Sequence, residues 1–186
     1  SGKLNCIKDG RIIDPAAGSG NFLTETYISL RRLENEVLRE LYGREIVLGA
    51  LDNPIKVSIA QFYGIEINDF AVVVARTAMW IAETGMKRET ASIVHHDLDF
   101  FPLRSEAHIA EDNALRLDWR TVCAAPDYII GNPPFVGYSL QSKEQKEDLL
   151  SVYVDESDKP YKATGKIDYV AGWYFKAAEM MQGTTI

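Results

Sequence analysis

The hydrophobic pattern of this chain alternates short apolar runs with longer segments of helical periodicity. Short strands are predicted at residues 11–13, 62–66, 108–112 and 127–131. Helices are predicted at residues 20–41, 69–85, 143–152 and 167–182. Strands that alternate with helices are typical of a parallel sheet with helices on both faces. The pattern therefore predicts an α/β fold built on a mostly parallel sheet.

The helix predicted at residues 69–85 carries an apolar stripe that we assign to the protein core. The stripe consists of Phe70, Val73, Val74, Met79, Trp80 and Ile81. Two stretches interrupt the regular order of strands and helices, at about residues 43–61 and 86–107. We interpret both as insertions and expect the second to be irregular.

A glycine-rich turn, residues 14–22, joins the first predicted strand to the first helix. Gly18 and Gly20 allow the backbone to pass close to a ligand. The turn lacks Lys and Arg and has no Gly-Lys-Ser/Thr ending, which argues against a triphosphate ligand. A carboxylate at Asp14 suits a ligand with an ammonium or sulfonium charge. Taken alone, the turn is also compatible with a tight strand-to-helix connection that binds nothing.

The second predicted strand ends in an acidic residue, Glu66. In dinucleotide-binding folds an acid at this place binds the ribose hydroxyls, about 20 residues after the glycine turn. The separation is larger here, and the insertion at 43–61 explains the excess. The alternative for Glu66 is a solvated residue at a strand end. Asp69 nearby is interpreted as a helix N-cap.

The stretch Asn132-Pro133-Pro134-Phe135 follows the fourth predicted strand. Two prolines fix the backbone and remove two N–H donors. The resulting rigid corner presents two acceptors, the Asn132 side-chain oxygen and the Pro133 carbonyl, beside the flat ring of Phe135. Such a corner suits a planar molecule with an exocyclic amino group, whose hydrogens the acceptors bind while its ring stacks on the aromatic face. The corner predicts chemistry on the amino group of a base.

Together these motifs resemble the S-adenosylmethionine-dependent DNA adenine methyltransferases. In this chain the cofactor motifs come before the Asn-Pro-Pro-aromatic motif. This is the motif order of the gamma class of these enzymes. The stretches Lys143-Glu-Gln-Lys-Glu-Asp and Gly165-Lys-Ile-Asp-Tyr-Val-Ala-Gly-Trp-Tyr-Phe-Lys-Ala-Ala are similar to the methyltransferase region of MmeI-like enzymes. Those enzymes join restriction and modification in one long polypeptide. Ala17 departs from the pattern, since these families often carry Cys there.

The resemblance implies an incomplete Rossmann-like class I methyltransferase fold with S-adenosylmethionine as cofactor and no metal. It implies a cofactor site of Asp14, Ala16, Gly18, Gly20, Asn21, Phe22, Glu66, Ile67, Asn113 and Ala114. It implies a catalytic site of Asn132, Pro133, Pro134 and Phe135. Asn113 stands where these families place an Asp that binds the cofactor's adenine amino group. Asp112 lies beside it, and Asp97 is a rival for the role.

Composition adds an expectation about DNA. The chain has 186 residues, the length of about one domain, with a formal net charge of −7 and a sequence pI of about 5.0. Contacts from Lys and Arg to phosphates dominate duplex affinity, so this charge counts against DNA binding by the chain alone. We interpret residues 1–186 as a catalytic core fragment. DNA is then expected to bind through additional domains of a longer protein, including an absent target-recognition domain.

Two further features concern the cellular setting and metals. No apolar run is long enough to span a membrane, and Cys6 and Cys123 are too few for a disulfide framework, so we expect a cytoplasmic protein. The three histidines lack metal-ligand spacing with the cysteines.

Three alternative functions stay open at this point. Methylation of adenine in RNA uses the same chemistry as methylation in DNA. Methylation of a protein glutamine uses a similar corner, although Tyr is the commoner aromatic residue there. A cofactor-sensing module of a restriction enzyme, without catalysis of its own, is the third possibility.

Overall fold

The computed structural model describes residues 10–42, 55–94, 106–154, 159–161 and 166–182. Its strands are β1 (Ile12–Asp14), β2 (Phe62–Glu66), β3 (His108–Glu111) and β4 (Tyr128–Ile129). Its helices are α2 (Asn21–Tyr42), α3 (Asp69–Val94), α4 (Lys143–Val152) and α5 (Ala171–Met181). Two short 3₁₀ turns, η1 (Ile59–Gln61) and η3 (Trp119–Thr121), precede β2 and β4.

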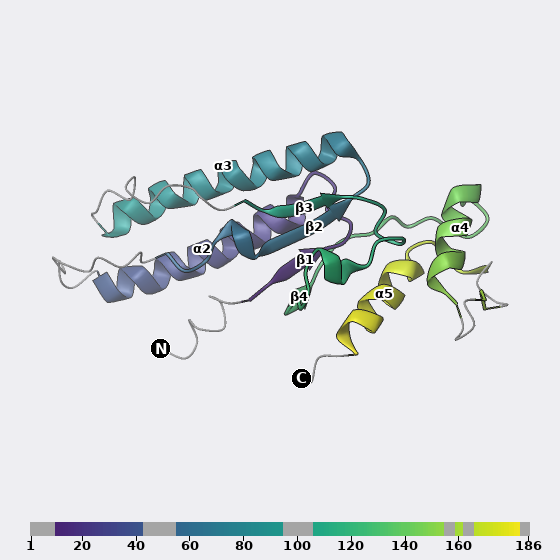
Figure 1. The fold of residues 1–186 in the computed structure, drawn as a ribbon. Coiled ribbons are helices and arrows are strands. Elements are labelled where there is room, and N and C mark those ends of the chain that lie inside the picture. The colour runs from purple at the N-terminus through teal and green to yellow at the C-terminus, as the bar shows by residue number, and fades with distance from the viewer. Residues whose placement is uncertain (1–9, 43–54, 95–105, 155–158, 162–165, 183–186) are drawn as a thin grey trace.

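The four described strands form one parallel sheet in the order β3-β2-β1-β4 (Figure 1). The chain builds outward from β1 to β2 and β3, and then returns to the other side of β1 to form β4. The strand order therefore reverses at β1, and open α/β sheets bind ligands outside the carboxyl ends of their strands at such a reversal. The residues that follow β1, β2, β3 and β4 meet at this edge.

Hydrophobic side chains form a core on each face of the sheet. Ile12 and Phe62 lie in the core that contains residues of α2 and α3. Ile13 and Ile65 lie in a second core with residues of α4 and α5, such as Leu149. Because side chains of a strand alternate between faces, β1 and β2 each contribute to both cores. The predicted α/β fold with helices on both faces is confirmed (Figure 1).

Helices α2 and α3 pack side by side on one face (Figure 1). Gly20, just before α2, has a φ of 81°, and a Cβ there would lie 2.9 Å from the Cβ of Ala75 in α3. Only a glycine combines this backbone conformation with so close an approach. Gly20 therefore serves helix packing as well as the turn.

The predicted core stripe of α3 is wrong for most of its members. Phe70, Val73, Trp80 and Ile81 are more than half exposed. Val74 is half-buried, and Met79 alone of the stripe is buried. The face that packs instead contains Val72, Ala75, Met79, Ala82 and Met86. Because α3 is apolar on two opposite faces, helical periodicity could not identify the buried one.

Helix α3 also continues to Val94, so residues 86–94 are helical rather than irregular. Of the interpreted insertion at 43–61, the structure describes residues 55–61, which end in η1. Strand β4 is shorter than predicted, and α5 begins four residues later than the predicted residue 167. Asp97 lies outside the described residues. None of the described helices is long and apolar enough to cross a bilayer.

Candidate functional site

A pocket of about 640 Å³ opens at the carboxyl edge of the sheet. Half of the predicted site residues line it, namely Ala16, Glu66, Ile67, Asn113, Ala114, Asn132 and Pro134. These residues follow all four strands, so the parallel topology brings together motifs that are more than a hundred positions apart. The volume lies within the range of about 300–1,000 Å³ that is usual for small-molecule sites.

The turn after β1 is fixed by backbone hydrogen bonds. Ala17 N donates to the carbonyl of Ile65 in β2 at 3.0 Å, and Gly20 N donates to the carbonyl of Ala17 at 2.8 Å. Gly18 has a φ of 53°, in the left-handed region. The turn therefore passes directly beside the end of β2.

Glu66 connects this turn to the start of α3. One carboxylate oxygen accepts from Gly18 N at 2.9 Å, and the other accepts from Asn68 N at 2.9 Å. A carboxylate has about four acceptor sites, so it can bind ligand hydroxyls as well. Ile67, the next residue, is 67% exposed and lines the pocket.

Asp14 lies under the backbone that leads to Asn132. Its side chain is fully buried, and Oδ1 accepts from Ala16 N at 2.9 Å. A Cβ at Gly131 would lie 2.5 Å from that Oδ1. Burial raises the pKa of Asp14 to about 6; the Ala16 amide opposes this shift and the charge of Glu66 adds to it. Within the described residues, Oδ2 of Asp14 has no hydrogen-bond partner.

Asn113 follows β3, and both polar ends of its side chain have partners in the protein. Its oxygen accepts from Leu115 N at 2.9 Å, and its amide nitrogen donates to Asp148 at 2.9 Å. One lone pair of the oxygen is left for a ligand. The neighbouring Asp112 also lines the pocket, and its Oδ1 accepts from Asn113 N at 2.7 Å.

The Asn-Pro-Pro-Phe corner (residues 132–135) begins where β4 is joined to β1, since Ile130 N donates to the Ile13 carbonyl at 2.9 Å. Asn132 and Pro134 line the pocket, whereas Pro133 and Phe135 do not. Phe135 is 72% exposed. Its ring is therefore open to an incoming molecule.

The backbone after the corner is held by the residues that precede α5. Tyr169 N donates to the Val136 carbonyl at 2.9 Å. Tyr138 N donates to the Asp168 carboxylate at 3.1 Å. These bonds join the corner to the C-terminal part of the described chain.

The other predicted cofactor residues lie outside the pocket lining. Gly18 and Gly20 shape the turn, as described above. Asn21 begins α2 and accepts from the Ser19 hydroxyl at 3.3 Å, and Phe22 is 49% exposed. Asp14 is buried beneath the corner rather than exposed to the pocket.

Sequence patterns missed the residues that α4, α5 and their approaches contribute. The pocket is also lined by Pro15, Ile65, Asp112, Arg116, Glu144, Gln145, Asp148, Tyr169 and Trp173. Of these, the sequence analysis gave a possible role in the site only to Asp112, as the neighbour of Asn113. The capping pair Ser142 and Gln145 marks the start of α4, but it does not indicate that the helix lines the pocket.

Asp148 is the most connected of these residues. It is 4% exposed and accepts from Asn113, from Arg116 Nε at 2.5 Å and from the Tyr169 hydroxyl at 2.9 Å. Burial by itself would raise the pKa of Asp148, but the three donors outweigh it and hold the pKa below its usual range. Asp148 is therefore an anion at neutral pH.

Trp173 connects α5 to the glycine-rich turn. Its indole N–H donates to the Pro15 carbonyl at 2.8 Å. Its ring meets that of Tyr169 edge to face, with centroids 5.2 Å apart. The turn is thus bound from both β2 and α5.

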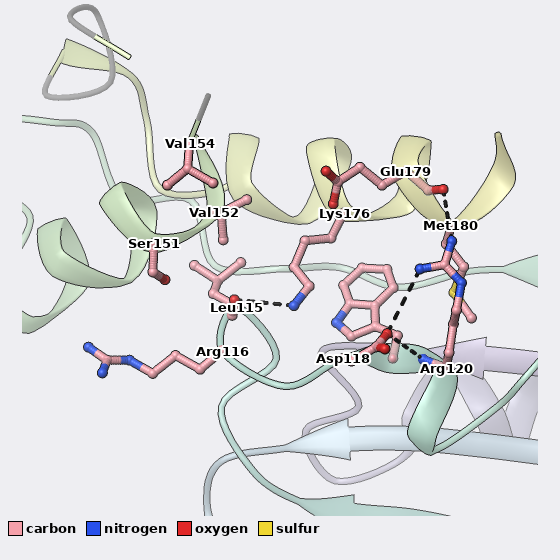
Figure 2. A pocket seen from close by; sticks show the side chains of 11 residues that line it. Leu115, Arg116, Asp118, Arg120, Ser151, Val152, Val154, Lys176, Glu179 and Met180 are labelled. Atoms are coloured by element: carbon pink, nitrogen blue, oxygen red, sulfur yellow. Dashed lines mark hydrogen bonds and ion pairs between the residues drawn. The ribbon is translucent and has the colours of Figure 1, made fainter. Parts of the chain in front are cut away.

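A second pocket, of about 420 Å³, is lined by residues of the segment between β3 and η3, of α4 and its end, and of α5 (Figure 2). Lys176 lies at its centre and donates to the carbonyls of Leu115, at 3.2 Å, and Leu117. Burial lowers the pKa of Lys176, while the charges of Asp118 and Glu179 oppose that shift. Because its ammonium already binds backbone carbonyls, this lysine fastens the segment to α5.

Comparison with known proteins identifies the family. A family model described as MmeI, DNA-methyltransferase domain, matches residues 3–186. The chain belongs to this family. The MmeI methyltransferase domain was the predicted resemblance, so that prediction is confirmed.

Two similar proteins are much longer than this chain. It is 38% identical over 180 residues to DNA methyltransferase A of Bacillus subtilis (strain 168), covering 94% of this chain and 20% of the relative. It is similar to the solved structure of the type IIL restriction-modification enzyme MmeI in complex with DNA, with a TM-score of 0.86 and 38% identity. That match covers 97% of this chain and 24% of the solved chain. The chain thus spans about a quarter or less of each relative.

Proposed function

We propose that this domain binds S-adenosylmethionine in the 640 Å³ pocket and transfers its methyl group to the exocyclic amino group of adenine in DNA. It acts as part of a longer restriction-modification protein. One observation carries the proposal: Asn132 and Pro134 of the corner line the same pocket as Ala16 and Glu66. A methyl donor held by the turn and β2 would thus lie next to the acceptors that hold the target amine.

The charged groups in and beside the pocket fit a cationic methyl donor. Glu66 retains acceptor capacity for ribose hydroxyls beyond its bonds to Gly18 and Asn68. Asp14 has one buried oxygen without a partner in the described chain, and a nearby ammonium or sulfonium charge would favour its ionised form. Arg116, the one cation of the lining, is already paired with Asp148.

The adenine end of the donor fits the segment that follows β3. Asp112 and Asn113 supply acceptors for an amino group, and Ile67 with Ala114 supplies apolar surface for a ring. The side-chain oxygen of Asn113 retains one lone pair for a ligand. Among the described residues, Oδ1 of Asp112 accepts from Asn113 N, and Oδ2 is left as a further acceptor. Asp112 therefore shares the role predicted for Asn113.

The residues of the corner act on the target nitrogen. S-adenosylmethionine supplies an already activated methyl group, so the reaction needs neither a metal nor a covalent nucleophile. The Asn132 oxygen and the Pro133 carbonyl accept the two amino hydrogens and make the nitrogen more tetrahedral and more nucleophilic. Positive charge would develop on that nitrogen as it takes the methyl group and S-adenosylhomocysteine leaves, so fixed acceptors stabilise the transition state more than the ground state. The methylated nitrogen would then lose one of its two protons to solvent.

Access to the target base requires extrusion from the duplex. A base inside a DNA helix cannot reach a pocket at the edge of a sheet, so the adenine is flipped out and its ring stacks on Phe135. The exposure of Phe135 supports this role. The names of the relatives favour DNA over RNA or a protein glutamine as the substrate. Two acceptors beside a cofactor pocket favour catalysis over a purely sensing role.

The deciding experiment measures transfer of a labelled methyl group by the intact protein to unmethylated duplex DNA, followed by digestion to nucleosides. N6-methyladenine is the expected product. Asn132→Ala should lower the transfer rate by about 100-fold or more, the loss usual for one transition-state hydrogen-bonding group, while cofactor affinity changes little. A wild-type rate in this variant, or label found on cytosine, would contradict the proposal.

A further inference from the structure

The segment of residues 112–117, between β3 and η3, forms one wall of the cofactor pocket. We call it the β3 loop. Asp112, Asn113, Ala114 and Arg116 of this loop line the pocket. The loop contains no strand or helix of its own; turn hydrogen bonds within it, such as those from Arg116 N and Leu117 N to the Asn113 carbonyl, and groups that contact it from outside together hold its shape.

Helix α5 fixes the outer side of the β3 loop (Figure 2). Lys176 donates to the carbonyls of Leu115 and Leu117. Gly172 lets the helix approach closely, since a Cβ there would lie 2.8 Å from Cδ2 of Leu115. These contacts hold the middle of the loop but do not reach the Asp112–Asn113 pair.

Helix α4 fixes that pair through Asp148. One oxygen of Asp148 accepts from both the Asn113 amide nitrogen and the Tyr169 hydroxyl, and the other accepts from Arg116 Nε. An ionised carboxylate only accepts, so the Asn113 amide nitrogen must face it. The amide oxygen is then directed away from α4, where it accepts from Leu115 N. The buried carboxylate thereby decides that the acceptor end of the amide, and not its donor end, is left for a ligand.

We propose that Asp148 is a positioning residue for recognition of the methyl donor's adenine. It acts through Asn113, and with it through Asp112, whose carboxylate accepts from Asn113 N. The inference rests on the proposed function, since it assumes that the adenine lies at the β3 loop. The inference predicts that Asp148 controls the selectivity for purines with an amino group at position six. That amino group donates to the Asn113 oxygen. A purely structural role would affect stability alone.

The experiment compares two ligands of the intact protein by titration calorimetry. S-adenosylhomocysteine carries the six-amino group, whereas S-inosylhomocysteine carries a carbonyl there and is otherwise the same. The wild type should prefer the adenosyl ligand by about tenfold or more, because the inosyl carbonyl leaves the acceptors without a donor. Asp148→Asn, which is nearly isosteric but brings an amide donor, should reduce this preference to about threefold or less.

A matched control separates positioning from general packing. Tyr153 follows α4, and its hydroxyl donates to the Ala171 carbonyl of α5 at 2.7 Å without lining the pocket. Tyr153→Phe removes a half-buried hydrogen bond that also joins these helices. It should lower the melting temperature and leave the ligand preference unchanged.

Each outcome decides a separate question. A wild type that binds neither ligand contradicts the proposed function itself. A wild type that binds both equally, or Asp148→Asn with the wild-type preference, overturns the inference about Asp148. If Asp148→Asn does not fold, Tyr169→Phe decides instead, because it removes one of the two donors on the oxygen that binds Asn113. An unchanged preference in Tyr169→Phe would then overturn the inference.

Discussion

Under the proposed function, Asp14 connects the fold to the ligand. Its carboxyl is buried beneath Gly131, and its pKa of about 6 lies far above the ordinary value of 3.8. Because the folded pKa is raised, the contribution of Asp14 to folding stability is complete below pH 3.8 and is lost as pH rises through about 6. The affinity for a cationic ligand should instead rise with pH, since only the ionised form of Asp14 attracts the cation.

We therefore expect affinity for S-adenosylmethionine to rise between pH 5 and pH 7, around the pKa of about 6. Calorimetric titration of the intact protein across this range measures the effect. Asp14→Asn is neutral at every pH, so its affinity should be lower at pH 7 and nearly independent of pH. The same pH dependence in wild type and variant would show that Asp14 does not respond to the ligand charge.

Phe135 is the second residue whose exposure bears on function. If a flipped base stacks on its ring, Phe135→Ala should weaken capture of DNA by about 1–3 kcal/mol, the usual value for stacking on one aromatic side chain. Cofactor affinity should not change, because Phe135 lies outside the pocket lining. Phe70 on α3 is a matched control, since its exposure of 73% equals that of Phe135 at 72% within a percentage point. Equal losses in Phe135→Ala and Phe70→Ala would argue against a specific stacking role.

At the scale of elements, a buried ion pair stabilises the packing of α2 against α3. Glu34 binds Arg31, and its other oxygen accepts from Lys56 N at 2.6 Å and Val57 N at 3.3 Å. Arg31 also donates to Thr90 of α3 at 2.5 Å. Both members of the pair are nearly inaccessible, with side-chain exposures of 0% and 2%.

Removing one partner leaves a buried charge, so Glu34→Ala should lower the free energy of unfolding by about 3–5 kcal/mol. Denaturant titration measures this change in the free energy of unfolding. Glu36→Ala, on the exposed side of the same helix, should stay within about 0.5 kcal/mol of wild type. A small effect at Glu34 would mean that Arg31 finds another partner or reaches water.

The elements also show which parts of the pocket and the core could be predicted from sequence patterns. The glycine turn, Glu66 and the Asn-Pro-Pro-Phe corner were predictable because each is a short motif at a strand end, and parallel strands place their ends at one edge. The contacts of Asp148, Tyr169 and Trp173 with the pocket were not, because they depend on how α4 and α5 pack across the sheet. The buried face of α3 was also undetermined, since Phe70 and Val72 are equally apolar but lie on opposite sides.

At the scale of the whole molecule, charge and length both bear on whether this chain can bind DNA by itself. The net charge of −7 gives no general attraction for phosphates. Lys143 and Lys146 of α4 alternate with acidic residues, and Lys143 lies 3.8 Å from Glu147. The relatives are four to five times longer than the segments that match, so most of each relative lies outside the shared domain.

We predict that residues 1–186 alone fold but do not methylate DNA. The two cores and the pocket lie within the described chain, so we expect this chain to fold and to bind the cofactor by itself. Recognition of base edges and extrusion of adenine need contacts to DNA that an acidic domain lacks. The measurement is labelled methyl transfer to unmethylated duplex DNA at low salt, where phosphate attraction is strongest. The intact protein serves as the positive control, and circular dichroism shows that the isolated domain is folded. Sequence-specific methylation by the 186-residue chain would contradict the prediction and assign DNA recognition to this domain.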